Sequence, residues 1–203
     1  TTFLVDRKDK NNSESINLNP FHSTPENQLA LQSNFRNQLF YNRGKQHYTL
    51  SYSYSDSSAR NVLSFGYVEQ ETTSHQLNFL HKIKEQWLLS LQTNFNENWS
   101  VSENFLSKNY QLSETLLNPK ISYLLDDNKR FDVYYQYQKK DNAIGDLEQL
   151  TQQKYGVSFT LTQNQKAAIT GEFNYFSNKF SGSSNTPVAY QMMEGLQPGT
   201  NFT

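Results

Sequence analysis

The sequence predicts an all-β fold, an antiparallel meander of about nine long strands that is part of a transmembrane outer-membrane β-barrel. Three observations predict this fold class. Apolar and polar residues alternate with a period of two, the polar positions are rich in Gln, Asn, Ser and Thr, and long and short connections alternate from the middle of the chain onward. A period of two places one set of side chains on each face of a sheet.

The composition is polar but rich in aromatic residues. Only 35% of the 203 residues are hydrophobic, yet they include 14 Phe, 13 Tyr and 2 Trp. Disordered chains have few aromatics and a high net charge, whereas this chain has a formal net charge of -1. Strands of membrane barrels reconcile the two properties, because one face meets lipid and the other a wet lumen. The near-zero charge gives no global field for binding nucleic acid.

The absence of cysteine excludes disulfides and thiolate metal sites. No apolar run approaches the ~20 residues of a membrane-spanning helix. A charged stretch at residues 6–10 follows directly on Thr1–Val5, so no signal peptide opens the sequence. An outer-membrane protein needs such a signal, and we therefore expect that it was cleaved or that this chain is a fragment.

Nine segments show enough alternation to be expected strands. Most are near the ~9–11 residues that a tilted membrane strand needs, whereas strands of soluble proteins are usually nearer ~5–6 residues. Segment 61–70 is the least regular of them. The expected strands cover residues 28–41, 48–55, 61–70, 76–83, 87–95, 117–125, 131–138, 154–161 and 167–176.

The connections give a second indication of a barrel. Segments 97–116, 140–151 and 177–199 are expected long loops, and segments 126–130 and 162–166 are expected short turns. Outer-membrane barrels have short periplasmic turns and longer outer loops. The same alternation places the tight turn at residues 84–86 on the periplasmic side. The first two hairpins are short at both ends and do not distinguish the sides.

A soluble antiparallel sheet, sandwich or small barrel also alternates. Strand length, amide-rich polar faces and aromatic residues at strand ends favour the membrane barrel instead. Those aromatic residues are Tyr41, Tyr54, Trp87, Phe95, Phe131, Tyr137 and Tyr175. The expected lipid-facing residues are Leu89, Leu91, Val133, Tyr135, Val157 and Phe159, and the expected lumen-facing residues are Gln92, Asp132, Gln136, Lys154, Ser158 and Glu172.

Charged residues and glycines on the expected strands suggest contacts between strands. Closing the turn at 162–166 with Leu161 opposite Ala167 places Lys154 across from Asn174 and diagonal to Glu172. Such a pair would stabilise the wall. Lys120 and Arg36 also fall on polar faces, and three glycines, Gly66, Gly156 and Gly171, suggest bends or close backbone approaches.

Two parts are expected along the chain. Residues 1–26 are a strand end and a polar loop, and residues 27–203 are a β-barrel segment. The chain stops just after the turn residues Pro198 and Gly199, so we expect further strands to be missing. Strands 29–41 and 167–176 should then not pair with each other, because a closed barrel needs every edge paired.

No motif predicts catalysis or metal binding. His22-Ser23-Thr24 sets a base beside hydroxyl groups, but no orienting carboxylate is near, so a solvated loop is favoured. His81 falls on an apolar face close to a turn. Asp126-Asp127-Asn128 could offer calcium ligands or form a turn, and the turn is favoured. We expect no catalytic, cofactor-binding or metal-ligating residues and no cofactor.

Three segments resemble a known family. They are 35–44 (FRNQLFYNRG), 118–123 (NPKISY) and 193–199 (MEGLQPG). From about Asn27 onward, the chain resembles the C-terminal β-barrel region of large, mostly uncharacterised outer-membrane proteins of Bacteroidota. The resemblance implies the fold, the outer-membrane location and further strands beyond this segment. It implies no catalytic residues.

The leading functional hypothesis is a non-enzymatic outer-membrane barrel segment that acts as a pore, an anchor, or a subunit of a transport or secretion assembly. Its expected partners are membrane lipids or lipopolysaccharide and other outer-membrane subunits, with no nucleic acid. One alternative is a soluble antiparallel β-sheet binding module. Another is an outer-membrane hydrolase, which would need a His with a Ser or Asp on adjacent strands.

Overall fold

The computed structural model describes residues 2–8, 28–43, 47–63, 66–126, 128–144, 148–163, 167–182 and 201–202. These residues form one ten-stranded sheet whose strands follow one another in chain order. The strands are β1 (Thr2–Lys8), β2 (Gln28–Tyr41), β3 (Tyr48–Leu63), β4 (Gly66–Lys84), β5 (Trp87–Ser102), β6 (Tyr110–Asp126), β7 (Lys129–Asn142), β8 (Gln149–Gln163), β9 (Ala167–Ser181) and β10 (Asn201–Phe202).

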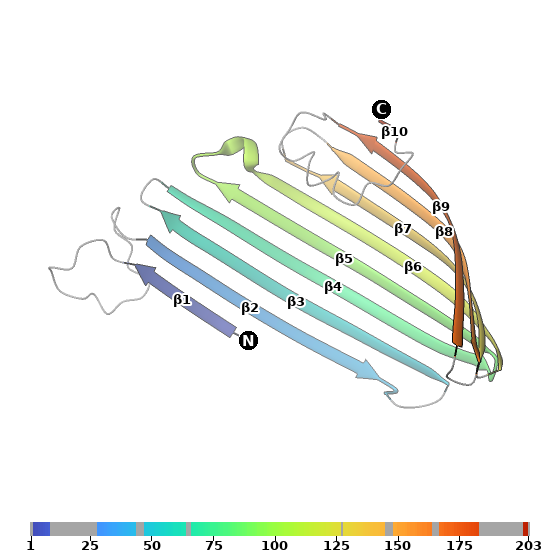
Figure 1. Cartoon of the computed structure of the whole chain (residues 1–203). Coiled ribbons are helices and arrows are strands. Elements are labelled where there is room, and N and C mark those ends of the chain that lie inside the picture. The colour runs from blue at the N-terminus through green and yellow to red at the C-terminus, as the bar shows by residue number, and fades with distance from the viewer. Residues whose placement is uncertain are drawn as a thin grey trace.

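The expected all-β antiparallel meander is confirmed from β1 to β9, and β10 adds a short parallel pairing to β9. The sheet is strongly curved but open (Figure 1). Among the described residues, β2 pairs with β1 and β3 while β9 pairs with β8 and β10, so the expectation that β2 and β9 do not pair with each other is confirmed. The described residues contain one helix, the 3-10 turn η1 (Leu106–Lys108), and no helix that is long and apolar enough to cross a membrane.

The expected strand 28–41 has the bounds of β2, whereas the seven strands from β3 to β9 are longer than expected, at 14 to 19 residues each. The expected separate strand at 61–70 is wrong, because β3 ends at Leu63 and β4 begins at Gly66. Its two halves therefore belong to the two arms of one hairpin. Gly66 has a φ of 136°, which a side chain with a Cβ rarely adopts, and this explains why a glycine begins β4.

Dividing residues 61–70 between β3 and β4 assigns every connection to one of two ends of the sheet. The connections at one end are 42–47, 85–86, 127–128 and 164–166. Those at the other end are 9–27, 64–65, 103–109, 143–148 and 182–200. Short turns thus lie opposite longer loops from β4 onward, whereas 42–47 is as long as 143–148 and 64–65 is shorter than the turn before it. The expected loops at 97–116 and 140–151 were too long, because β5, β6, β7 and β8 continue into them. We call these ends the turn end and the loop end.

Local side-chain hydrogen bonds hold two of the turns. Asn42, at a positive φ of 59°, donates from Nδ2 to the carbonyl of Tyr48 at 2.8 Å. Asp126 accepts the backbone N–H of Asn128 at 2.9 Å, which is the bond that makes Asp a turn residue. This hydrogen bond also lowers the pKa of the Asp126 carboxyl below its usual value. The turn interpretation of Asp126 is therefore supported, and the described residues contain no group of three potential metal ligands.

The expected register between β8 and β9 was wrong by two residues. Leu161 lies opposite Ile169, and the hairpin closes with Gln163 opposite Ala167. This register places Gly171 opposite Phe159, and a Cβ on Gly171 would overlap the Phe159 ring. Gly171 thus marks a close approach, as the sequence suggested, because only a glycine leaves room for the ring to lie across the strand.

We expect the change Gly171→Ala to lower the free energy of unfolding by about 1–3 kcal/mol, since the new methyl group must displace the Phe159 ring. Urea titration of the detergent-folded protein, followed by tryptophan fluorescence, measures this loss. Thr170→Ala on the same exposed strand is the matched control and should change little. Phe159→Leu should recover part of the loss in the Gly171→Ala background. An unchanged midpoint for Gly171→Ala would contradict the close approach.

Candidate functional site on the two faces of the sheet

The register assigns every strand residue to one of two faces. Leu89 lies opposite Ile121, Ile121 opposite Val133, Val133 opposite Val157, and Val157 opposite Phe173. Residues that lie directly opposite each other share a face. We call this the apolar face. It carries all six residues expected to face lipid, namely Leu89, Leu91, Val133, Tyr135, Val157 and Phe159.

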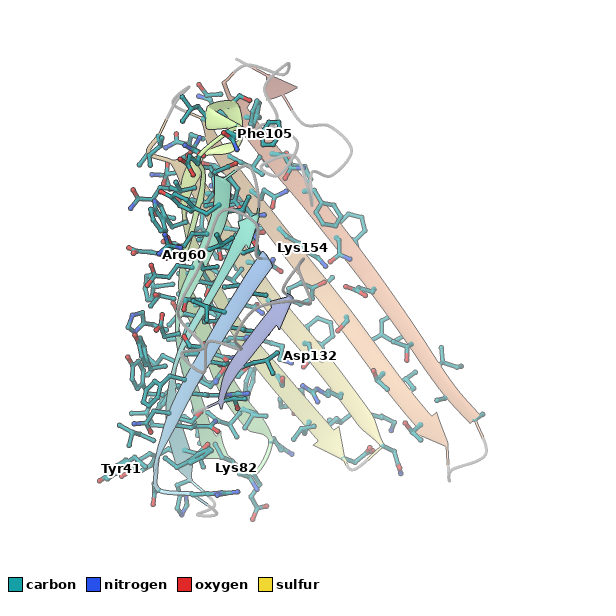
Figure 2. The ribbon with its side chains drawn as sticks, turned by 90° about the vertical axis from the view of Figure 1, so that its left-hand side faces the viewer. Tyr41, Arg60, Lys82, Phe105, Asp132 and Lys154 are labelled. Carbon is teal, nitrogen blue, oxygen red and sulfur yellow. The ribbon has the colours of Figure 1, made fainter. Side chains whose placement is uncertain are left out.

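The other face, the polar face, carries the residues expected to face a lumen. Gln92 lies opposite Asn78 and Asn118, Gln136 opposite Lys154, and Ser158 opposite Asp132 and Glu172. In Figure 2, Tyr41 and Arg60 project to the outside of the curved sheet, whereas Asp132 and Lys154 lie on the side toward which it curves. The sequence therefore predicted correctly which residues share a face.

Burial on the two faces is the reverse of that in a soluble protein. Large apolar side chains are exposed, with 70% of Phe173 and 62% of Ile169 accessible to solvent. Small polar side chains are buried instead, and Ser122 is only 1% exposed. In the described residues the buried hydrophobic cluster is limited to Leu112, Leu150 and Phe180, near the loop end of the polar face. Soluble domains place their apolar residues inside, so the arrangement is inverted.

On the apolar face, aromatic side chains lie at both limits of a band of apolar side chains. Toward the turn end, Trp87 contacts Tyr123 with ring centroids 4.8 Å apart, and Tyr41 contacts Tyr48 at 6.2 Å. Toward the loop end, Tyr54 contacts His75 at 5.0 Å. The residues Tyr135, Tyr155 and Tyr175 form a further row, at 4.8 and 6.3 Å. Four aromatic residues expected at strand ends lie within strands instead, namely Tyr54, Phe95, Tyr137 and Tyr175.

Beyond the band, toward the loop end, the same face becomes charged. Arg60 lies opposite Glu69, and Asp56 lies opposite Thr73, which bonds its carboxylate at 3.3 Å. In β7, Lys139 pairs with Asp141 at 2.9 Å, and this contact raises the pKa of the Lys139 ammonium group. The strands thus continue as a charged rim past the apolar band. This rim explains why they are longer than the alternation predicted.

A hollow of about 420 Å³ lies on the polar face and is lined by side chains from β3, β4, β5, β6 and β7. Its polar lining consists of hydroxyl and amide groups together with one ammonium group. These residues are Thr49, Ser51, Asn78, Ser90, Gln92, Asn118, Lys120, Tyr134 and Gln136. A hollow that spans so many strands follows from the curvature of the sheet toward its polar face.

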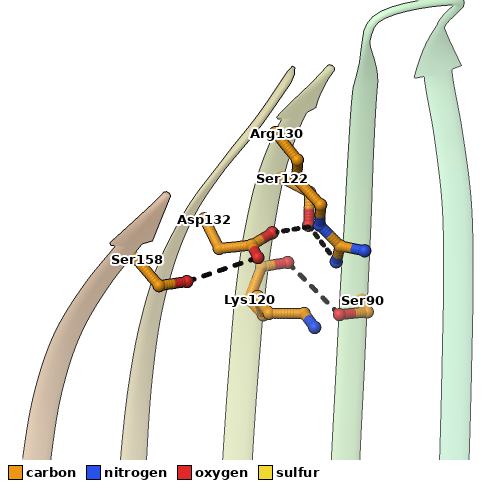
Figure 3. A network of polar contacts seen from close by, with 6 residues as sticks. All are labelled: Ser90, Lys120, Ser122, Arg130, Asp132 and Ser158. Atoms are coloured by element: carbon orange, nitrogen blue, oxygen red, sulfur yellow. Dashed lines mark hydrogen bonds and ion pairs between the residues drawn. The ribbon is translucent and has the colours of Figure 1, made fainter. Parts of the chain in front are cut away.

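An ion pair with hydroxyl partners lies on the polar face near the turn end (Figure 3). The Arg130 guanidinium contacts the Asp132 carboxylate at 2.8 Å and donates to Ser122 Oγ at 3.1 Å. The second oxygen of Asp132 accepts from Ser158 Oγ at 3.4 Å. The sequence predicted the face of Asp132 but not these partners, because they come from three neighbouring strands.

A second polar cluster surrounds Tyr134. Its ring lies over Gly156, where a Cβ would overlap it, and its hydroxyl bonds Glu172 and Asn174 two strands away. Lys154 Nζ lies 3.8 Å from Glu172 Oε1 and 5.3 Å from the centre of the Tyr134 ring. The expected Lys154–Glu172 pair is thus present, although Lys154 lies opposite Phe176 and not opposite Asn174.

The histidines offer no catalytic arrangement in the described residues. His81 lies on the apolar face near a turn, as expected, with Nδ1 3.0 Å from the His47 carbonyl oxygen. His75 Nδ1 lies 2.7 Å from the Tyr52 hydroxyl. The His22-Ser23-Thr24 motif lies outside the described residues.

Comparisons with protein-family models, with curated proteins and with solved structures found no match to this chain.

We expect Arg130 and Asp132 to stabilise each other by about 1 kcal/mol in a double-mutant cycle of Arg130→Met and Asp132→Asn, since the Asp132 side chain is only 14% exposed. Urea titration of the four proteins gives this coupling energy. The pair Lys129–Asp126, with side chains 51% and 47% exposed, is the matched control and should show a smaller coupling. Equal coupling in both cycles would contradict a structural role for the Arg130 network.

Proposed function

We propose that this chain forms part of the wall of an outer-membrane β-barrel, a non-enzymatic element that acts as a pore, an anchor, or a subunit of a transport or secretion assembly. The observation that carries the proposal is the inverted burial, with exposed apolar side chains on one face and sheltered polar side chains on the other. Lipid covers the apolar face, and water fills the space on the polar face.

The extent of the apolar face supports lipid as its cover. Exposed apolar surface costs about 25 cal/mol per Å², and soluble monomers rarely expose contiguous patches beyond a few hundred Å². Here exposed large apolar side chains occur on every strand from β2 to β9. A soluble binding module would need a second layer to cover this area. Hydrocarbon covers it without one.

Backbone pairing supports the same environment. A segment in hydrocarbon must satisfy its N–H and C=O groups internally, and strands do so only through their neighbours. The antiparallel ladders from β2 to β9 are nearly continuous. Pro119, which has no N–H to donate, interrupts the β6–β7 ladder between Leu117 and Lys120, and two register irregularities, at Lys82–Lys84 and Leu124–Asp126, lie close to the turn end. Irregularities at that end fall near the limit of the apolar band, where backbone groups reach water.

Location and partners are inferred from the sequence together with these faces. Short turns at one end and longer loops at the other are typical of outer-membrane barrels, as are aromatic rows at both limits of the band. The resemblance to the barrel region of Bacteroidota outer-membrane proteins favours the same location. Membrane lipids or lipopolysaccharide would contact the apolar face, and other outer-membrane subunits would extend the wall.

Cysteine labelling tests the assignment of the two faces directly, since the chain contains no cysteine of its own. In the whole protein, in its native membrane, we expect Val133→Cys and Val157→Cys to resist a charged maleimide, because the reactive thiolate does not form in hydrocarbon. Gln136→Cys and Ser158→Cys, on the polar face, should react with it readily. Ready reaction of Val133→Cys and Val157→Cys with the charged reagent would show that water covers the apolar face, as in a soluble module.

Substitution by arginine tests the energetic cost of that environment. We expect Val157→Arg to lower the free energy of unfolding in lipid vesicles by about 2–4 kcal/mol, because Val157 lies within the apolar band. Ser158→Arg, the adjacent residue on the polar face, is the matched control and should cost much less, since Asp132 lies opposite it. Urea titration in vesicles measures both values. Similar losses for the two variants would contradict the lipid contact.

A further inference from the structure

A row of uncharged polar side chains crosses the polar face at one level of the sheet. Ser51 lies opposite Asn78, Asn78 opposite Gln92, and Gln92 opposite Asn118. Gln136 lines the same hollow from β7, beside Asn118. We call these five residues the amide row. The register thus places four side-chain amides and one hydroxyl next to one another across five strands.

Most of the hydrogen-bonding capacity of the amide row is available. Asn78 donates to Ser51 Oγ at 3.4 Å and accepts from Gln76 at 3.4 Å. The side-chain amides of Gln92, Asn118 and Gln136 make no hydrogen bond to any other described residue, although all three are half-buried in the hollow. Each amide offers two N–H donors and a carbonyl acceptor. The hollow therefore presents both donors and acceptors that a ligand or water can bond.

Charge near the amide row is largely compensated within the protein. Arg130 is paired with Asp132, and Lys154 is paired with Glu172. Lys120, which also lines the hollow, lies beside the Arg130–Asp132 network, and its positive charge acts on the Asp132 carboxylate (Figure 3). A ligand of the amide row thus meets one positive charge, that of Lys120, beside two neutral pairs. Strong binding of a polyanion or a polycation is not favoured there.

The row continues into a second hollow. A space of about 330 Å³ is lined by Gln136, Gln138, Gln152, Lys154 and Phe176, and it shares Gln136 with the first. Lys154 Nζ lies 5.3 Å from the centre of the Phe176 ring, so the ammonium group covers that ring face. That face of Phe176 is not free for stacking, and hydrogen bonds to the side-chain amides would provide most of the contacts. The two hollows together form an elongated polar track along the wall.

We propose that the amide row is a binding site for a neutral, polyhydroxylated ligand, an oligosaccharide chain. Sugar hydroxyls both donate and accept hydrogen bonds, as side-chain amides do, and several sugar units match a track shared by two hollows. The site rests on the proposed function insofar as the polar face must be open to water. A wet site of this kind binds weakly, in the millimolar range, because water competes for every amide.

Isothermal titration calorimetry of the whole protein in detergent, with maltohexaose as the probe, tests the proposal. We expect saturable binding, and roughly two- to tenfold weaker binding for each of Gln92→Leu and Gln136→Leu, because each change removes hydrogen bonds between neutral groups. Gln70→Leu, on the polar face but outside both hollows, is the matched control and should bind as the parent does. A carboxylated oligogalacturonate of the same length should bind no better than maltohexaose.

Circular dichroism of each variant confirms that the strands form, and Gln136→Asn, which keeps an amide, should bind better than Gln136→Leu. Absence of maltohexaose binding, or equal binding by all the leucine variants, would overturn the sugar site. The cysteine labelling described above separates this outcome from failure of the barrel proposal. Correct labelling without sugar binding overturns the site alone. Sugar binding with a water-exposed apolar face would support the site within a soluble module.

Discussion

The antiparallel register from β2 to β9 is the constraint on which both surfaces depend. Because residues that lie opposite each other share a face, one shift of a single residue would move a whole strand's apolar side chains to the other face. The rows Leu89–Ile121–Val133–Val157 and Asn78–Gln92–Asn118 exist only in this register. Tight connections at the turn end, such as the one at residues 85–86, hold it.

Period-two alternation predicted the strands where it was strong and failed where both faces are polar. Around Trp87–Phe95 only Thr93 interrupts the apolar face, and the strand was predicted at the right place. Past Phe95 the residues Asn96, Glu97 and Asn98 are polar on both faces, so the alternation predicts that the strand ends at Phe95. Its backbone pairing continues to Ser102. Backbone hydrogen bonds do not depend on side-chain polarity, and sequence patterns therefore miss such extensions.

The faces of the candidate site could be predicted from the sequence, but its contacts could not. Alternation alone assigned Gln92, Gln136 and Ser158 to one face. The hydrogen bonds of Arg130 and the position of Tyr134 over Gly156 join residues of several strands, and they follow from register and curvature. The Lys154–Glu172 pair was predicted from a wrong hairpin register. It forms nevertheless, because the two long side chains reach each other although the register differs by two residues.

The charged rim has an electrostatic consequence for anything that approaches the loop end. From His75, at the edge of the apolar band, to Glu69 the chain runs six residues along β4, about 20 Å at ~3.3 Å per residue. Even for a strand tilted by about 45°, this places Glu69 roughly 14 Å above the band, beyond the Debye length of about 8 Å at physiological ionic strength. In the proposed barrel, Glu69, at the outer edge of the rim, would therefore be screened from charges at the level of the apolar band, whereas Asp56, opposite Thr73 and close to the band, would not be. A macromolecule that approaches the loop end would meet Glu69 and its partner Arg60 first.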